Sequence, residues 1–131
     1  MSISVELAGL RDAIADTDRA PYLLTVADDG RPHSVAVSFE WRDDELAMPV
    51  GNRTLANART RELVSLLWAP SDPGGYSLIV DATVTETRGT GQGDNELVVR
   101  PTRAVLHRPA ATTDATADGC GADCVPVLRP S

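Results

Sequence analysis

The residues best suited to chemistry lie in one short segment, Pro49-Val-Gly-Asn-Arg-Thr-Leu-Ala-Asn57. An apolar run ends at Val50, Gly51 interrupts it, and a helical pattern follows. The free N–H groups and the dipole at the start of a helix attract anions. Arg53 and the Thr54 hydroxyl could add hydrogen bonds to a phosphate. The same pattern also fits an ordinary helix that is capped by Thr54 and carries exposed arginines.

The charge distribution singles out the same region. The 131 residues carry a net charge of −7, and all twelve basic residues are arginine. Residues 50–68 are the exception to this negative charge, because they contain three arginines, Arg53, Arg59 and Arg61, and only one acidic residue, Glu62. The acidic total argues against nucleic acid and anionic membranes as partners, since both require a basic surface. A positive segment in an acidic chain is what a small anionic ligand requires.

The other polar motifs predict little chemistry. His33 and His107 have no serine, cysteine or aspartate at a spacing typical of a catalytic triad, so we expect an ordinary surface or structural role for each. Gly89, Gly91 and Gly93 separate two strand patterns, which indicates a hairpin turn and not a dinucleotide-binding loop. We therefore identify no catalytic residue and no metal site from the sequence.

Both cysteines, Cys120 and Cys124, lie near the end of the chain in a C-x3-C pattern. Together with the distant His107 they do not supply the four ligands of a structural zinc site. Free thiols, a reversible disulfide that senses oxidants, and a metal contact remain open. The small, polar composition from residue 109 onward predicts a flexible linker and a cysteine-containing tail over residues 109–131.

Hydrophobic periodicity predicts one mainly β domain over residues 1–108. Leu7, Leu10 and Ile14 indicate an amphipathic N-terminal helix, with Ser4 as its N-cap. A second, short helix is expected over residues 54–61. An antiparallel barrel is the simplest arrangement of the strands, because closure removes exposed edges. Six strands are predicted, over residues 22–27, 34–41, 46–50, 63–68, 76–87 and 96–107.

Three stretches, taken with the order of elements, resemble the flavin-binding split β-barrels related to pyridoxamine 5′-phosphate oxidase. Residues 22–37 are similar to the first hairpin of that family, and residues 53–67 to its phosphate-binding helix and the next strand. Residues 76–84 resemble the strand that carries a G-x-A or D-x-A signature. The arginine- and alanine-rich composition resembles that of actinobacterial proteins, among which the family uses flavin mononucleotide (FMN) or the deazaflavin coenzyme F-420.

The resemblance implies a homodimer of six-stranded split barrels with two cofactor sites at the subunit interface. Trp41 or Trp68 would pack across that interface. Family members commonly have a lysine or arginine where Thr54 stands, and a proline where Glu62 stands. By position, Arg53, Thr54 and Asn57 would meet the cofactor phosphate, Val35, Ala36, Val37 and Ser38 would lie beside the ring system, and Pro49 and Val50 would lie nearby.

These observations predict a cytoplasmic oxidoreductase that transfers a hydride between FMN or F-420 and a small conjugated substrate. The start of the sequence shows no export signal, and no apolar run reaches the roughly 20 residues that span a bilayer. The shortage of acids, bases and nucleophiles fits this reading, because the cofactor would carry the hydride. The alternative is a non-catalytic protein that binds or sequesters a flavin, haem or another planar ligand, which Thr54 in place of a cation favours.

Overall fold

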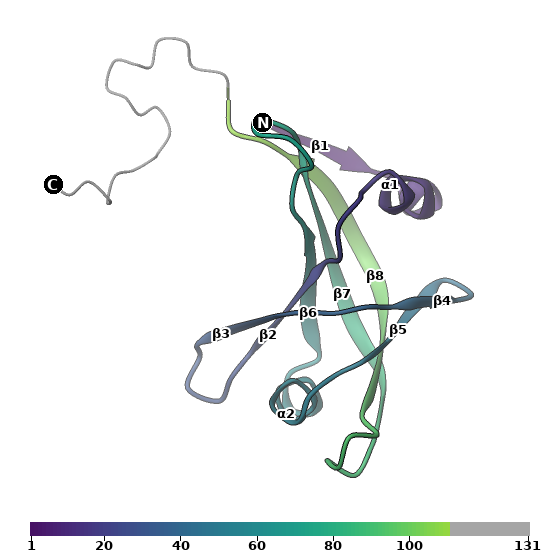
Figure 1. Cartoon of the computed structure of the whole chain (residues 1–131), viewed down its shortest axis with the longest axis vertical. Coiled ribbons are helices and arrows are strands. Elements are labelled where there is room, and N and C mark those ends of the chain that lie inside the picture. The colour runs from purple at the N-terminus through teal and green to yellow at the C-terminus, as the bar shows by residue number, and fades with distance from the viewer. Residues whose placement is uncertain (111–131) are drawn as a thin grey trace, which may run out of the picture.

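The computed structural model describes residues 1–110, which form one eight-stranded antiparallel sheet and short helices (Figure 1). The strand order is β3-β2-β6-β7-β8-β5-β4, and β1 pairs with β8 outside this path. The elements in chain order are β1 (Ser2–Val5), the 3-10 turn η1 (Leu7–Gly9), α1 (Leu10–Ala15), β2 (Tyr22–Val26), β3 (Pro32–Ala36), β4 (Glu40–Arg42), β5 (Glu45–Pro49), α2 (Asn52–Thr60), β6 (Leu63–Trp68), β7 (Ser77–Arg88) and β8 (Glu96–His107).

The long strand β8 organises the sheet by pairing with three other strands. It runs alongside β7 for its whole length, while its other edge pairs first with β5 and then with β1. The β7–β8 register shifts next to Pro101, where Asp81 lies opposite Arg103 and Ala82 opposite Pro101. Proline has no N–H to donate, so a bulge at this position accommodates it without leaving a broken ladder bond.

The N-terminal segment accounts for one of the two strands that the sequence reading missed. Ser4 was expected to cap a helix, but it lies in β1 and faces Val105 in the ladder. The helix α1 begins only at Leu10, with Gly9 as its N-cap and no side-chain cap. The edge of β8 beyond β5 offers unpaired backbone groups, and residues 2–5 satisfy them. The expected apolar face is confirmed for Leu10 and Ile14, which are buried.

The second missed strand arises because the single strand expected over residues 34–41 is divided into β3 and β4. Between them, the Val37 N–H donates to the Pro21 carbonyl at 3.0 Å instead of joining a ladder. Figure 1 shows this segment crossing the view in front of β6, β7 and β8. The predicted alternation is nevertheless confirmed, since Val35, Val37 and Phe39 are at least partly buried while the intervening residues are exposed.

The closed six-stranded barrel expected from the sequence is not what the structure contains. The sheet has eight strands, and β3 and β4 form its two ends, with no ladder between them in residues 1–110. The sheet is therefore open, although the β3–β4 segment passes from one of its ends to the other. Closure was expected because it would remove exposed strand edges. The β3–β4 segment does not close the sheet, because β3 pairs only with β2 and β4 pairs only with β5.

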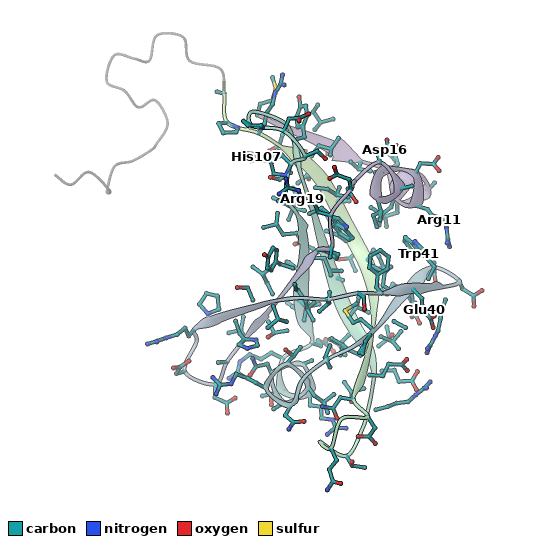
Figure 2. All side chains as sticks on the ribbon, in the orientation of Figure 1. Arg11, Asp16, Arg19, Glu40, Trp41 and His107 are labelled. Carbon is teal, nitrogen blue, oxygen red and sulfur yellow. The ribbon has the colours of Figure 1, made fainter. Side chains whose placement is uncertain are left out.

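The core lies on the inner face of β2, β6, β7 and β8 and is completed by the β3–β4 segment. Trp68 is only 1% exposed, and its ring meets Phe39 edge to face at 5.9 Å between centroids. Trp41 is half-buried and stacks under the Arg11 guanidinium at 4.2 Å, as the labelled side chains in Figure 2 show. Trp68 is thus a core residue and lies away from any surface that could meet a partner.

Several expectations concern the tail or the membrane. The predicted linker and tail, with Cys120 and Cys124, fall almost wholly outside the described residues. The last strand, β8, ends at His107, which lies inside the predicted domain of residues 1–108. Within residues 1–110 no helix is long and apolar enough to cross a membrane.

Candidate functional site

The start of helix α2 lies directly after the end of β5, as the segment 49–57 predicted. Gly51 is the N-cap and makes no side-chain capping bond, while the Leu55 N–H donates to the Gly51 carbonyl at 3.1 Å. The predicted cap, Thr54, is wrong: it lies within the first turn and is 2% exposed. Because the first N–H groups of a helix have no intrahelical partner, the uncapped turn is suited to bind an anion.

A hollow of about 460 Å³ opens at this helix terminus, and we call it the first hollow. It brings together seven of the nine predicted cofactor-binding residues, from the end of β3, the end of β5 and the start of α2. Its volume lies within the range of small-molecule sites. Its lining consists of His33, Val35, Ala36, Val37, Pro49, Val50, Gly51, Asn52, Arg53 and Thr54.

Arg53 is the arginine in this hollow, and it is unusual in having no partner. Of the twelve arginines, eleven lie in residues 1–110. Ten of these eleven contact a carboxylate, a carbonyl oxygen, a hydroxyl or an aromatic ring, whereas Arg53 makes no such contact in the described part of the chain. No carboxylate of residues 1–110 lines the first hollow. Its electrostatic environment is therefore positive, within an acidic protein.

Two predicted site residues do not line the first hollow. Asn57 is 6% exposed, and its Nδ2 donates to the Thr25 hydroxyl at 3.0 Å, which fixes α2 against β2. Ser38 lines a neighbouring hollow instead. Asn57 thus has a structural partner inside the protein, which the position of an asparagine one turn into a helix could not reveal.

His33 is the residue of the first hollow that the sequence reading missed. It lies on β3 opposite Thr25, and its Nδ1 is buried without a hydrogen-bond partner among residues 1–110. Its side chain shares a face with Val35 and Val37, since alternate residues of a strand point the same way. The same alternation of buried and exposed residues would have placed His33 on the inner face, but the strand was predicted to begin only at residue 34.

A second hollow, also of about 460 Å³, adjoins the first across Pro49, which lines both. Three of its lining residues are acidic. Arg42 donates to Glu96 at 2.7 Å and to Glu40 at 2.9 Å, and the hydrogen bond lowers the pKa of Glu96. The backbone and hydroxyl of Thr90 likewise lower the pKa of Asp94. The lining consists of Ser38, Phe39, Glu40, Ala47, Pro49, Gly93, Asp94, Asn95 and Glu96.

The glycine-rich β7–β8 hairpin holds the start of α2 in place through Asn95. The side chain of Asn95 is buried, donates from Nδ2 to Asn52 Oδ1 at 2.8 Å, and accepts the Gly91 N–H at 3.0 Å. Its carbonyl accepts the Val50 N–H at 3.3 Å. Asn95 therefore joins three elements, and the predicted turn also acts as the support of the first hollow.

Several solved structures share this fold at low sequence identity. An F-420 reductase aligns with a TM-score of 0.58 at 19% identity, over 71% of this chain and 94% of that protein. A candidate pyridoxamine 5′-phosphate oxidase of Listeria innocua aligns with a TM-score of 0.60 at 18% identity, over 77% of this chain and 98% of that protein. An FMN-binding protein of Syntrophomonas wolfei aligns with a TM-score of 0.59 at 16% identity, over 76% of this chain and 84% of that protein. The haem storage protein HutZ of Vibrio cholerae aligns with a TM-score of 0.56 at 13% identity, over 80% of this chain and 96% of that protein.

Two mycobacterial proteins are related to the chain in sequence. Uncharacterized proteins of Mycobacterium bovis and Mycobacterium tuberculosis are each 42% identical to this chain, in alignments of 133 positions that cover 92% of this chain and 93% of theirs. The chain belongs to the same protein family as these two. No family model matches it.

Proposed function

We propose that the protein binds a flavin-type cofactor, FMN or F-420, in the first hollow, with the cofactor phosphate at the start of α2. The observation that carries the proposal is the partnerless Arg53 beside an uncapped helix terminus, in a hollow without carboxylates. The fold neighbours described as an F-420 reductase and an FMN-binding protein support it. The residues of the hollow fit such a group, because apolar strand residues adjoin the anion-binding end.

The proposed activity is hydride transfer to or from a small conjugated substrate. The cofactor would supply the redox chemistry, and the chain would bind it, orient it and exclude water. Val35, Val37 and Val50 offer an apolar wall for the ring system, and Arg53 fixes the opposite end. The second hollow favours FMN, because its lining includes no basic residue that could bind the polyglutamate tail of F-420.

Replacing Arg53 by alanine is expected to weaken FMN binding about 10- to 100-fold. A charge-assisted hydrogen bond contributes about 1.5–3 kcal/mol, and each 1.4 kcal/mol is a factor of ten in Kd. The dissociation constant is measured by the change in flavin fluorescence during titration. Arg61→Ala is the matched control, because Arg61 lies in the same positive segment but bonds Asp28 at 2.9 Å. Equal affinity of R53A and the unmodified protein contradicts the assignment.

We also propose that the protein is a homodimer with the cofactor sites at the subunit interface. The outer sheet face, which we call the apolar face, carries Tyr22, Leu24, Val26, Leu63, Leu67 and Ile79, which are exposed or only partly buried. Two polar residues, Ser65 and Asp81, lie among them and bond each other. Leu67 lies opposite both Tyr22 and Ile79 in the ladders. Tyr22 in turn faces Ala36, which lines the first hollow. A second copy on this face would therefore reach the rim of the hollow.

Tyr22→Arg is expected to convert the dimer to a monomer, because a charge placed in an apolar interface loses hydration without gaining a partner. The molar mass is measured by light scattering after size-exclusion chromatography. Leu7→Arg is the control, because Leu7 is as exposed as Tyr22 (49% against 47%). Leu7 lies in η1, outside the apolar face, so this variant should remain a dimer. A monomeric unmodified protein, or a dimer that survives Y22R, would contradict this interface.

The second candidate function is non-catalytic binding of haem. His33 favours it, because an imidazole in an apolar hollow can serve as an axial ligand of haem iron, and the haem storage protein has the same fold. Titration with haemin, followed by the Soret absorbance, separates the two functions. Haemin binding that needs His33, without flavin binding, would favour the haem function.

A further inference from the structure

We propose that the second hollow binds the positively charged end of a planar, conjugated substrate, whose remaining part lies beside the ring system in the first hollow. This inference rests on the proposed function, because it names the class of substrate for the proposed site. The class is an organic cation with a delocalised charge, such as an amidinium, an iminium or a substituted pyridinium. Neutral and anionic molecules of the same shape should bind more weakly.

The position of the second hollow suits a substrate. Pro49 lines both hollows, so a molecule in the second hollow lies next to a molecule in the first. Transfer of a hydride requires the reacting atoms to be in contact, and the substrate must therefore adjoin the ring system. The volume of about 460 Å³ is sufficient for a small molecule.

The apolar part of the lining suits a planar molecule. It consists of Phe39, Ala47 and Pro49. The ring of Phe39 meets Trp41 and Trp68 edge to face, with centroid distances of 6.5 and 5.9 Å. Because two neighbouring rings fix its orientation, Phe39 can contact a flat ligand at little cost in conformational freedom. The face of an aromatic ring also attracts cations.

The charge of the lining is negative, because Glu40 (Figure 2), Asp94 and Glu96 belong to it and no basic residue of residues 1–110 does. Arg42 donates to Glu40 at 2.9 Å and to Glu96 at 2.7 Å, which offsets part of their charge. Asp94 has no basic partner in this part of the chain, and its bonds come from the backbone and hydroxyl of Thr90. These neutral donors stabilise the carboxylate without cancelling its charge.

The two adjoining hollows thus have opposite electrostatic environments. The first contains Arg53 and no carboxylate of residues 1–110, whereas the second contains Asp94 and no basic residue of that range. A cation is therefore attracted to the second hollow and repelled from the first, and a phosphate is distributed in the reverse way. Each hollow rejects the ligand of the other, which is how repulsion contributes to specificity.

The test uses three planar probes of nearly the same shape: benzamidine, a cation; benzamide, which is neutral; and benzoate, an anion. Each is titrated into the protein without cofactor, and binding is followed by the NMR signals of the backbone amides of Gly93, Asp94 and Asn95. We expect benzamidine to bind about tenfold more tightly than benzamide, because its hydrogen bonds to the carboxylates are charge-assisted. Benzoate should bind more weakly than either. Equal affinities for benzamidine and benzamide would overturn the inference.

Asp94→Asn should weaken benzamidine binding about fivefold and leave benzamide binding unchanged. The amide oxygen of asparagine can still accept from Thr90, so the hairpin turn is retained. Asp72→Asn is the matched control, because it changes the net charge equally, but Asp72 lies between β6 and β7 and does not line the hollow. Equal losses in D94N and D72N would assign the selectivity to net charge and would contradict a site at Asp94.

Titration of the FMN-loaded protein separates this inference from the proposed function. Benzamidine should bind to the loaded protein with the same preference over benzamide, and it should shift the visible absorbance of the flavin, since the hollows adjoin at Pro49. If FMN excluded benzamidine, the inference would fail while the proposed function stood. Absence of FMN binding would overturn the proposed function, whereas the titrations without cofactor would still decide whether the second hollow selects cations.

Discussion

Replacing Gly89 by alanine is expected to lower the free energy of unfolding by about 2–5 kcal/mol. A Cβ at this position would lie 2.4 Å from Asn95 Oδ1 and 2.6 Å from its Cα, so the backbone of Asn95 would have to move. The φ of +133° adds strain for any residue with a side chain. Overpacking contributes about 1–3 kcal/mol and the backbone conformation about 1–2 kcal/mol.

The effect of G89A should reach the candidate site as well as the stability. Asn95 holds Asn52 and Val50, so its displacement moves the start of α2 and the rim of the first hollow. We therefore expect FMN affinity to fall in G89A even under conditions where the variant is fully folded. Urea unfolding at 25 °C measures the free energy of unfolding, and flavin titration measures the affinity.

Gly93→Ala is the matched control for this prediction. Gly93 lies in the same hairpin with a φ of +90°, but a Cβ there would meet nothing within 4 Å. G93A should therefore carry the backbone strain alone, about 1–2 kcal/mol. If G93A destabilised the protein as much as G89A, the close approach of Asn95 would not be the cause.

Trp68→Ala is expected to lower the free energy of unfolding by about 3–5 kcal/mol. Trp68 is among the largest fully buried side chains of residues 1–110, and its removal leaves a cavity against Phe39 that the surrounding strands cannot fill. This loss is a large share of the roughly 5–15 kcal/mol by which native domains are stable. The measurement is again urea unfolding, followed by circular dichroism so that the signal does not depend on tryptophan.

Trp41→Ala supplies the comparison within the same chain. Trp41 is half-buried, and it contacts the Arg11 guanidinium and the edge of Phe39. Its truncation removes less buried surface, and we expect a loss of about 1–2 kcal/mol. Equal losses from W41A and W68A would show that Trp68 is not the main packing residue of the core.

The candidate site was partly predictable because its residues are close in sequence. The segment from Pro49 to Thr54 lies in one stretch of chain, and its order of strand, glycine and helix defines an anion-binding geometry by local rules. Val35 and Val37 followed from strand alternation and from the family resemblance. His33 follows the same alternation as Val35 and Val37, but the strand was expected to begin only at residue 34. The partner of Asn57 could not be predicted, because it depends on the packing of α2 against β2, which local periodicity does not report.

The strand count failed for a related reason. The sequence pattern of residues 34–41 is one continuous alternation, and only the tertiary structure separates it into β3 and β4. Residues 2–5 pair with β8 because that edge is free, a fact that local sequence does not contain. A period of two reports which face a residue occupies, but it does not report which strand lies alongside.

By itself the sequence determined the class of the fold, the alternation of buried and exposed residues, the positive segment in an acidic chain and the strand–glycine–helix segment at Gly51. These depend on residue type and short spacing, which act within one or two turns of chain. The tertiary structure alone decided that the sheet stays open, that Asn57 bonds Thr25, and that Arg53 and His33 share one hollow. Such contacts join residues distant along the chain, so they exist only once the strands have paired.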